Sequence, residues 1–171
     1  MDADVAAHAL NAPPLYERDS ELALLGDCVE SVRERGEGCA VLIGSEAGGG
    51  KTSLVREFCR REAPSARALI GGCDPLFAPR PLGPFFELAD ELGPGVRELL
   101  ARGSEPYEIV AALSAALQGE QATILVFEDL HWADEATLDV LRLLIRKVGP
   151  LPAVLVLTYR DDELDLSLIH I

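Results

Sequence analysis

Short runs of consecutive apolar residues alternate along this chain with longer segments in which apolar residues recur every third or fourth position. Such runs are typical of strands buried on both faces of a parallel sheet, and such segments are typical of helices that cover a sheet. The runs predict strands at 41–43, 67–71, 124–127 and 153–160. The spaced pattern predicts helices over 20–35, 52–61, 85–92, 106–117 and 135–148. This order predicts an α/β domain of three layers, with helices on both faces of a parallel sheet.

Polar residues that favour helix starts precede several of these helices. Asp19 or Ser20 is the predicted N-cap of the first helix, Ser104 marks the start of the fourth, and Asp134 is the predicted N-cap of the last. Four prolines lie within the ten residues 75–84. They predict a long, stiff connection without regular structure.

A glycine-rich segment follows the first apolar run and carries the candidate chemistry. It reads Gly44-Ser45-Glu46-Ala47-Gly48-Gly49-Gly50-Lys51-Thr52-Ser53. Phosphate oxygens need converging N–H donors, which a backbone without side chains supplies by curling closely, and the next helix adds its positive dipole end. Lys51 would reach the β- and γ-phosphates and Thr52 would bind Mg²⁺. Ser45 replaces the first glycine of the phosphate-loop pattern, and a glycine-rich hairpin that happens to end in Lys-Thr is the alternative interpretation.

Composition narrows the classes of partner. The chain has 171 residues, of which 49% are apolar, so it has room for one α/β domain with a proper core. Its net charge of −14 argues against binding nucleic acid or an anionic membrane through the surface field. The only lysines are Lys51 and Lys147, so one of the two stands where a phosphate loop needs it. No apolar run approaches the about 18 residues of a membrane span and no signal peptide is evident, which predicts a cytoplasmic protein without membrane contact.

Charged residues end two of the predicted strands. Glu128 and Asp129 follow the run at 124–127, and Arg160 ends the run at 153–160 together with Thr158. Ligands of open α/β sheets bind beyond the carboxyl ends of strands, and Mg²⁺ prefers carboxylate oxygens. Because successive strand residues face opposite ways, one acid would serve the cation and the other would orient or deprotonate the attacking water. Acidic turn residues without function, and a plain surface arginine, are the alternatives.

Five segments together resemble a known family, at residues 15–22, 44–53, 73–84, 128–134 and 158–164. The most specific is the string Glu128-Asp129-Leu130-His131-Trp132-Ala133-Asp134. They are similar to the N-terminal ATPase module of large bacterial LuxR-type transcriptional regulators, within the STAND class of signal-transduction ATPases related to the AAA superfamily. Related modules also accompany adenylate cyclase and protein kinase domains. The resemblance implies an AAA-like P-loop NTPase fold over about residues 15–165.

The resemblance also implies an ATPase with ATP and Mg²⁺ as cofactors. It implies nucleotide contacts from Ser45, Gly48, Gly49, Gly50, Lys51, Thr52 and Ser53, and an adenine border formed by the segment that ends at Arg18. It places Thr52 and Glu128 at the metal, Asp129 in the position of the catalytic acid and Arg160 in that of the γ-phosphate-sensing arginine. The sequence departs from the family pattern at Ser45, and at Glu17, where many relatives have glycine. Despite these departures, tight binding of ATP by the intact protein is still expected, while efficient hydrolysis stays open. His131 and Trp132 are compatible with a sensor turn, or with a capping histidine beside a half-buried tryptophan.

The two ends of the chain are expected to lie outside this domain. Residues 1–14 are interpreted as a flexible leader, 15–165 as the ATPase domain and 166–171 as a tail of non-native sequence. A genuine short hydrophobic tail is the alternative for 166–171. Sheets of the family usually run 5-1-4-3-2, so a fifth strand and a helical lid are expected beyond residue 171. A fragment of this kind should expose the edge of the phosphate-loop strand, aggregate readily and bind ATP weakly.

In the intact protein, ATP binding and slow hydrolysis would gate self-association and output. An unknown inducer would act on the module, ADP would be the product, and DNA would be bound only through another domain. A small-molecule P-loop kinase and a non-hydrolysing ATP-dependent scaffold remain alternatives. The residues leave open the output domain, the oligomeric state and the division of roles between Glu128 and Asp129.

Overall fold

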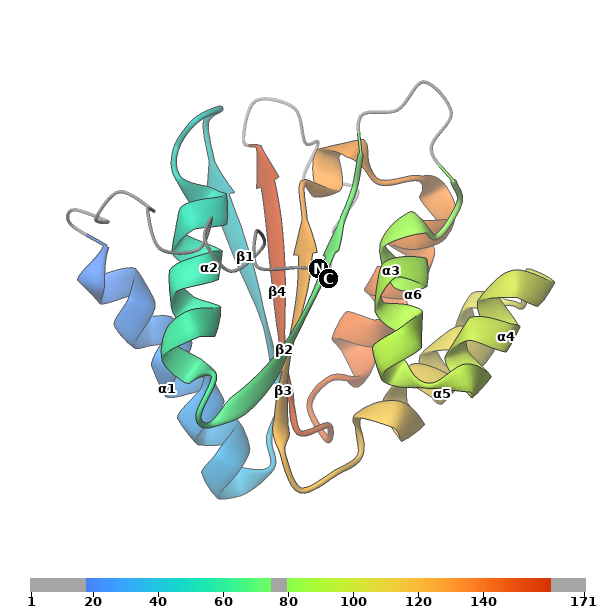
Figure 1. Cartoon of the computed structure of the whole chain (residues 1–171), viewed down its shortest axis with the longest axis horizontal. Coiled ribbons are helices and arrows are strands. Elements are labelled where there is room, and N and C mark those ends of the chain that lie inside the picture. The colour runs from blue at the N-terminus through green and yellow to red at the C-terminus, as the bar shows by residue number, and fades with distance from the viewer. Residues whose placement is uncertain (1–17, 75–79, 161–171) are drawn as a thin grey trace, which may run out of the picture.

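The computed structural model describes residues 18–74 and 80–160 of the chain, so the predictions for 1–17, 75–79 and 161–171 lie outside the described residues. Four parallel strands form one sheet in the order β1-β4-β3-β2 (Figure 1). The strands are β1 (Cys39–Ser45), β2 (Ala66–Gly72), β3 (Ala122–Glu128) and β4 (Ala153–Arg160). The order matches the predicted one for these four strands, and a fifth strand beside β1 stays a prediction.

The last strand of the described chain lies in the middle of the sheet. β4 pairs with β1 from Cys39↔Val154 to Ser45↔Arg160, and with β3 from Thr123↔Ala153 to Phe127↔Leu157. Both β3 and β4 are buried along nearly their whole length, as their apolar runs predict. Because all four strands are parallel, their carboxyl ends lie at one edge of the sheet, which we call the carboxyl edge.

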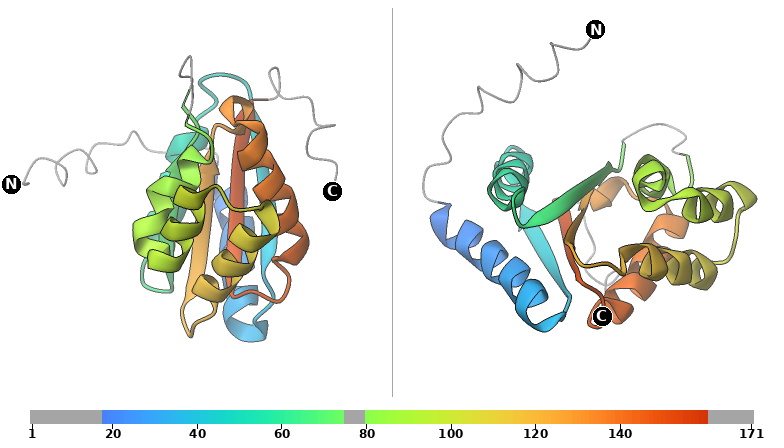
Figure 2. Two further views of the ribbon diagram at one scale, coloured as in Figure 1. Left: turned by 90° about the vertical axis from the view of Figure 1, so that its right-hand side faces the viewer. Right: turned by 60° about the horizontal axis from the view of Figure 1, so that its bottom comes forward.

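Helices cover both faces of this sheet (Figure 2). On one face lie α1 (Asp19–Arg35) and α2 (Lys51–Glu62). On the other lie α3 (Gly83–Leu92), α4 (Pro94–Arg102), α5 (Pro106–Leu117) and α6 (Glu135–Lys147). A single turn of 3₁₀ helix, η2 (Leu130–Trp132), joins β3 to α6. The three-layer α/β prediction is therefore confirmed.

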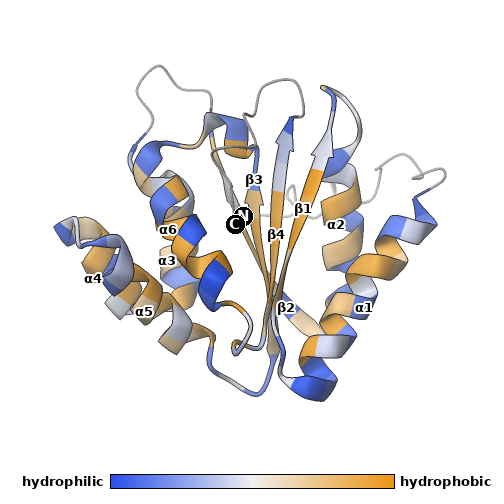
Figure 3. Ribbon diagram, turned by 180° about the vertical axis from the view of Figure 1, so that it is seen from behind, coloured by the Kyte–Doolittle hydropathy of each residue, from blue (hydrophilic) through white to orange (hydrophobic). Residues whose placement is uncertain are grey.

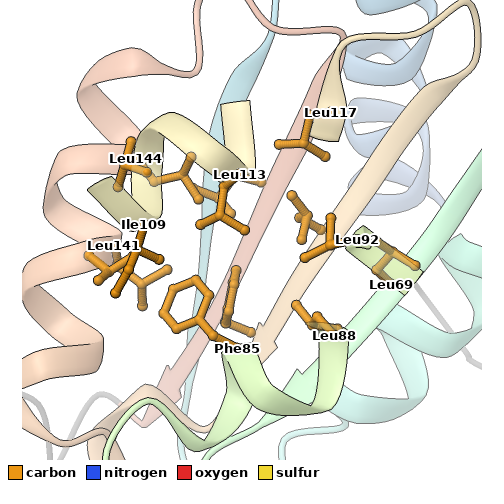
Figure 4. Packing of buried hydrophobic residues seen from close by; sticks show 14 of the residues in the cluster. Leu69, Phe85, Leu88, Leu92, Ile109, Leu113, Leu117, Leu141 and Leu144 are labelled. Carbon is orange, nitrogen blue, oxygen red and sulfur yellow. The ribbon is translucent and has the colours of Figure 1, made fainter. Parts of the chain in front are cut away.

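Each face buries its own apolar core, and hydrophobic residues lie both along the strands and on the helices that cover them (Figure 3). The smaller core packs Leu25, Val29 and Phe58 of α1 and α2 against the sheet. The larger core packs α3–α6 against the opposite face, where leucines and Phe85 interdigitate (Figure 4). The Phe85 ring lies 4.9 Å from that of Phe127 on β3, a tilted aromatic contact.

Three predictions about the helices need correction. α1 begins one residue early, with Arg18 at its N-cap and the Arg18 carbonyl accepting the Leu22 N–H, so Asp19 lies in the first turn, where its charge suits the dipole. α5 is capped by Glu105, whose N–H donates to the Glu108 carboxylate at 3.1 Å, and not by Ser104.

The third correction is α4, which the sequence pattern did not predict. It is only nine residues long and begins at Pro94 and Gly95, between Gly93 and Gly103. Pro at a first helical position is favourable, but two glycines and a proline within three residues are also typical of a loop. Val96 and Leu100 lie one turn apart and pack into the larger core, and this burial stabilises the helix.

Candidate functional site

The predicted site residues gather at the carboxyl edge. The glycine-rich loop joins β1 to α2 at this edge (Figure 1). Arg160 pairs in register with Ser45 on the neighbouring strand, and Glu128 ends β3, the next strand along. Segments more than 100 residues apart in the chain are thus brought to one end of the sheet.

Two glycines give the loop its curvature. Gly48 and Gly50 adopt φ values of 76° and 78°, in the left-handed region that side chains disfavour. Gly49 is required for space, because a Cβ there would lie 2.4 Å from the Ser45 hydroxyl oxygen. The serine that departs from the phosphate-loop pattern is therefore accommodated by the missing side chain of Gly49.

Lys51 turns back into the loop that precedes it. Its ammonium donates to the Ser45 carbonyl at 2.9 Å, to the Ser45 hydroxyl at 3.1 Å and to the Glu46 carbonyl at 3.3 Å. The side chain is almost fully buried, which is rare for lysine and is tolerated here because three oxygens accept its protons. The ammonium of Lys51 is thus held in the loop by three neutral oxygens.

The start of α2 adds N–H donors at the same place. Gly50 is the N-cap and carries no capping side chain, and the first turn contains no acidic residue. The first N–H groups of a helix have no partner within the helix, and they lie at the positive end of its dipole. Thr52 and Ser53 lie in this turn and are half-buried. The arrangement is therefore able to bind an anion.

Arg18 contacts the loop from α1. Its guanidinium donates to the Gly49 carbonyl at 2.9 Å and to the Glu21 carboxylate at 3.2 Å. The Ser20 hydroxyl donates to the other oxygen of Glu21, and this bond, ahead of the contribution of Arg18, lowers the pKa of Glu21. Sequence reasoning placed Arg18 near an adenine, whereas the described contacts of its side chain are to the loop backbone and to Glu21.

Glu128 and Asp129 lie in different surroundings, but not through the predicted strand alternation, because β3 ends at Glu128 and Asp129 belongs to the turn that follows. One carboxylate oxygen of Glu128 is buried and has no hydrogen-bond partner in the described part of the chain. Such a group is costly unless something binds it. Asp129 adopts φ 57°, and its N–H donates to the Thr158 hydroxyl of β4 at 3.0 Å. This bond fixes the turn after β3 to the centre of the sheet.

His131 and Trp132 form the turn that follows the two acids. The His131 side chain is fully buried, and its Nδ1 lies 4.0 Å from an oxygen of Asp129. The Trp132 ring is 38% exposed and lies 5.1 Å from the imidazole, centre to centre. The aromatic turn is therefore in contact with the second acid.

A cleft of about 320 Å³ opens at the carboxyl edge beside this turn. It is lined mainly by the end of β2, the start of α3 and the residues that follow η2, among them Cys73, Arg80, Phe86, Trp132 and Asp134. The Arg80 guanidinium lies 3.4 Å from the centre of the Phe86 ring. The Cys73 N–H donates to the Glu128 carbonyl at 3.0 Å, so the wall of the cleft is bonded directly to β3.

Asp134 joins the two segments that border the cleft. It caps α6 by accepting the Thr137 N–H at 3.0 Å and the Thr137 hydroxyl at 2.6 Å, which confirms the predicted N-cap. The same carboxylate accepts the N–H of Leu82, a residue held at φ 61° at the start of α3. Sequence reasoning missed this second role, because no local pattern signals a bond across 52 residues.

Negative charge is concentrated around the ends of β2 and β3. Burial raises the pKa of the Cys73 thiol to about 12, and nearby carboxylates, first Asp134 and then Asp129, raise it further. Burial likewise raises the pKa of Cys59 on α2 to about 11, with Glu128 as the second cause. The positive Lys51 loop and these carboxylates therefore occupy the same edge, as binding of a cation together with an anion requires.

The described residues contain neither a metal-binding cluster of side chains nor a helix that could cross a membrane. No group of three or more histidine, cysteine, aspartate or glutamate side chains there is arranged to hold a metal ion. No helix within 18–74 or 80–160 combines the length and apolar character that a membrane crossing needs.

Comparison with known proteins identifies the family of the chain. Residues 14–157 match the model of the AAA ATPase domain. An uncharacterized protein of Rhizobium meliloti (strain 1021) is 29% identical over 194 residues, which cover 87% of this chain and 19% of that protein. The crystal structure of Cdc6p from Pyrobaculum aerophilum superposes with a TM-score of 0.65 and 21% identity, over 99% of this chain and 46% of Cdc6p. The chain thus spans less than half the length of either protein, and it belongs to the AAA ATPase domain family.

Proposed function

We propose that this chain is the ATP-binding switch of a bacterial signal-transduction ATPase, of the type found in LuxR-family transcriptional regulators. The family assignment supports an AAA ATPase domain, and the resemblance of the string at 128–134 supports the narrower class. The observation that carries the proposal is the buried Lys51 ammonium inside the glycine-rich loop, at the start of α2, where the first N–H groups have no partner within the helix. The oxygens of Ser45 and Glu46 occupy the positions around Lys51 that phosphate oxygens would take over.

The residues present fit a Mg²⁺ ion bound together with the nucleotide. Glu128 offers a buried carboxylate oxygen that has no hydrogen-bond partner among residues 18–74 and 80–160, and the Thr52 hydroxyl lies in the first turn of α2. Mg²⁺ keeps several waters and takes few protein ligands, so one carboxylate and one hydroxyl with phosphate oxygens suffice. When bound, the cation neutralises charge on the phosphates.

Asp129 is the proposed acid that orients the attacking water. Its side chain is 42% exposed, so solvent reaches it, while the bond of its N–H to Thr158 holds its backbone in place. Arg160, one strand away from Glu128 and in register with Ser45, is the proposed sensor of the γ-phosphate. Turnover is proposed to be slow, because the module's task is to report whether ATP or ADP is bound.

ATP and ADP switch such a module only by binding its two shapes with different affinity. Self-association, an inducer and DNA binding through another domain are proposed properties of the whole protein, which would act in the cytoplasm. An adenylate cyclase or protein kinase output domain is the alternative within the same class. The sequence of the complete gene decides between these outputs, since each leaves a recognisable downstream domain.

The two lysines of the chain provide the test of ATP binding. Titration calorimetry with Mg·ATP should show binding to the natural chain and to Lys147→Ala, because Lys147 ends α6 in an exposed position. Lys51→Ala should bind at least tenfold more weakly, since charge-assisted bonds are worth about 1.5–3 kcal/mol. Equal affinity of Lys51→Ala and Lys147→Ala for Mg·ATP would show that residues 44–53 are not a phosphate loop.

A small-molecule kinase is the second candidate function, and the cleft beside β3 is the observation in its favour. The cleft adjoins Glu128 through Cys73 and carries the Arg80 guanidinium, as an acceptor site would. Phosphorus NMR of ATP turnover separates the two functions. Release of inorganic phosphate to water without any acceptor indicates the switch, and transfer to an added small molecule indicates the kinase.

A further inference from the structure

Arg18 links the start of α1 to the phosphate loop at a single backbone atom. It lies at the N-cap of α1, and its guanidinium donates to the carbonyl oxygen of Gly49 at 2.9 Å. Its other amino group pairs with Glu21 one turn further along, so the guanidinium is held from two sides. Planar, forked guanidinium groups lose little freedom when they are fixed in this way.

The geometry of a peptide unit makes this contact relevant to phosphate binding. The Gly49–Gly50 peptide is trans, so the Gly49 carbonyl and the Gly50 N–H point in opposite directions from one rigid plane. A bond that holds the carbonyl toward α1 therefore turns the Gly50 N–H away from α1. Glycine on both sides of the unit gives that plane more freedom to rotate than any other pair of residues, so it needs an external hold.

The Gly49 N–H is already engaged in the loop. It donates to the Glu46 carbonyl at 3.1 Å, while Lys51 donates to the same carbonyl at 3.3 Å. These bonds fix the peptide that precedes Gly49, and the described bond that fixes the following peptide comes from Arg18. Gly50 in turn is the N-cap of α2, where N–H groups have no partner within the helix.

We propose that Arg18 is a positioning residue for phosphate binding, because it orients the Gly49–Gly50 peptide so that the Gly50 N–H is presented to a polyphosphate. The proposal rests on the proposed function and deepens it. It assigns Arg18 to the phosphates through the backbone, and not to the adenine that the family resemblance suggests. The charge of Arg18, close to the loop, adds to the attraction for an anion.

Inorganic tripolyphosphate separates the two roles, because it has the phosphates of ATP and no base. Affinities for Mg·ATP, Mg·tripolyphosphate and adenosine are measured for the natural chain, Arg18→Ala, Arg18→Lys and the control Arg33→Ala on the exposed side of α1. We expect Arg18→Ala to weaken ATP and tripolyphosphate binding by the same factor, about tenfold for one misdirected donor to a charged group. Arg18→Lys should restore part of this loss, Arg33→Ala should cost nothing, and adenosine binding should be unchanged.

A thermal unfolding scan excludes a merely structural role. Arg18 and Glu21 are both about one-third exposed, so loss of their pair should lower Tm by no more than about 3 °C. If Arg18→Ala weakens the binding of ATP but not of tripolyphosphate, the Arg18 side chain contacts the adenine base and the inference is wrong. Unchanged binding of both ligands also overturns it. If the natural chain binds neither ligand, the proposed ATP binding itself fails, and the inference fails with it.

Discussion

The two faces of the sheet are built differently. The face covered by α3–α6 buries the larger of the two apolar cores. The face covered by α1 and α2 buries a smaller core, and its helices carry Arg18 and Lys51, both bonded to the phosphate loop. Most of the apolar packing and these proposed phosphate contacts thus lie on opposite sides of the same strands, so substitutions on the two faces should have separable effects.

Phe85→Ala on the larger face should give the largest effect. Phe85 is fully buried against Phe127, and removal of such a ring typically costs about 3–5 kcal/mol. Urea unfolding should show this loss, while the fraction that stays folded should bind ATP with unchanged affinity. The neighbouring Phe86→Ala is the control, because Phe86 is only half-buried and should cost much less. A change in ATP affinity with Phe85→Ala would show that the two faces are not separable.

Glu128→Gln, at the end of β3, should weaken ATP binding and not stability. Loss of the charge beside the metal position should weaken Mg²⁺-dependent ATP binding at least tenfold, a difference of about 1.4 kcal/mol or more. Asp129→Asn is the paired variant, which should bind Mg·ATP nearly as well as the natural chain and stop its hydrolysis. Titration with and without Mg²⁺ and a phosphate-release assay measure the two effects. The reverse result would mean that the roles of Glu128 and Asp129 are exchanged.

Asp134→Ala should have an intermediate effect on stability. The variant loses the N-cap of α6 and leaves the Leu82 N–H unpaired, for a total of about 1–3 kcal/mol. Asp139→Ala, an exposed position on α6 bonded to Arg142, should change the free energy of unfolding by less than about 0.5 kcal/mol. Equal losses in urea unfolding would show that Asp134 does not join the two segments.

Glu57→Gln on α2 should give the smallest effect, and one that depends on pH. Bonds from Arg60 and then Arg61 lower the pKa of Glu57 to about 2 from its ordinary 4.5. A lowered pKa means stabilisation that is present above pH 4.5 and lost as the pH falls toward 2. Because the site is at the surface, we expect at most about 1 kcal/mol at pH 7 and less at pH 3 in urea unfolding. Glu91→Gln, at an exposed position on the opposite face, is the matched control.

The sequence predicts the sheet and most helices because their signals are local. The four apolar runs correspond to the four strands, and the glycines before Lys51 correctly predict the loop between β1 and α2. The short helix α4 was not predicted, because its first residues, Pro94 and Gly95, are equally typical of a loop. The burial of Val96 and Leu100 depends on contacts with the rest of the larger core, which the local sequence does not contain.

The contacts that organise the site were less predictable for a related reason. Arg18 with Gly49, Asp129 with Thr158 and Asp134 with Leu82 are hydrogen bonds between residues 29 to 52 positions apart. Each joins a side chain to a backbone group, and a backbone group carries no signature in the sequence. Residue types at the ends of strands indicate where a site lies, but not which of them hold its backbone.

The central position of β4 has a consequence for how the chain folds as it is synthesised. β1 emerges first among the strands, yet its partner in the described sheet, β4, ends at residue 160. Pairs such as Cys39↔Val154 close a loop of more than 100 residues, which is slow, so β1 waits unpaired while β2 and β3 associate. The glycine-rich loop and Glu128 acquire their mutual position only when β4 inserts between them. The proposed nucleotide site therefore forms only after β4 has emerged, and a chain stalled before residue 153 should gain no protection against proteolysis from ATP.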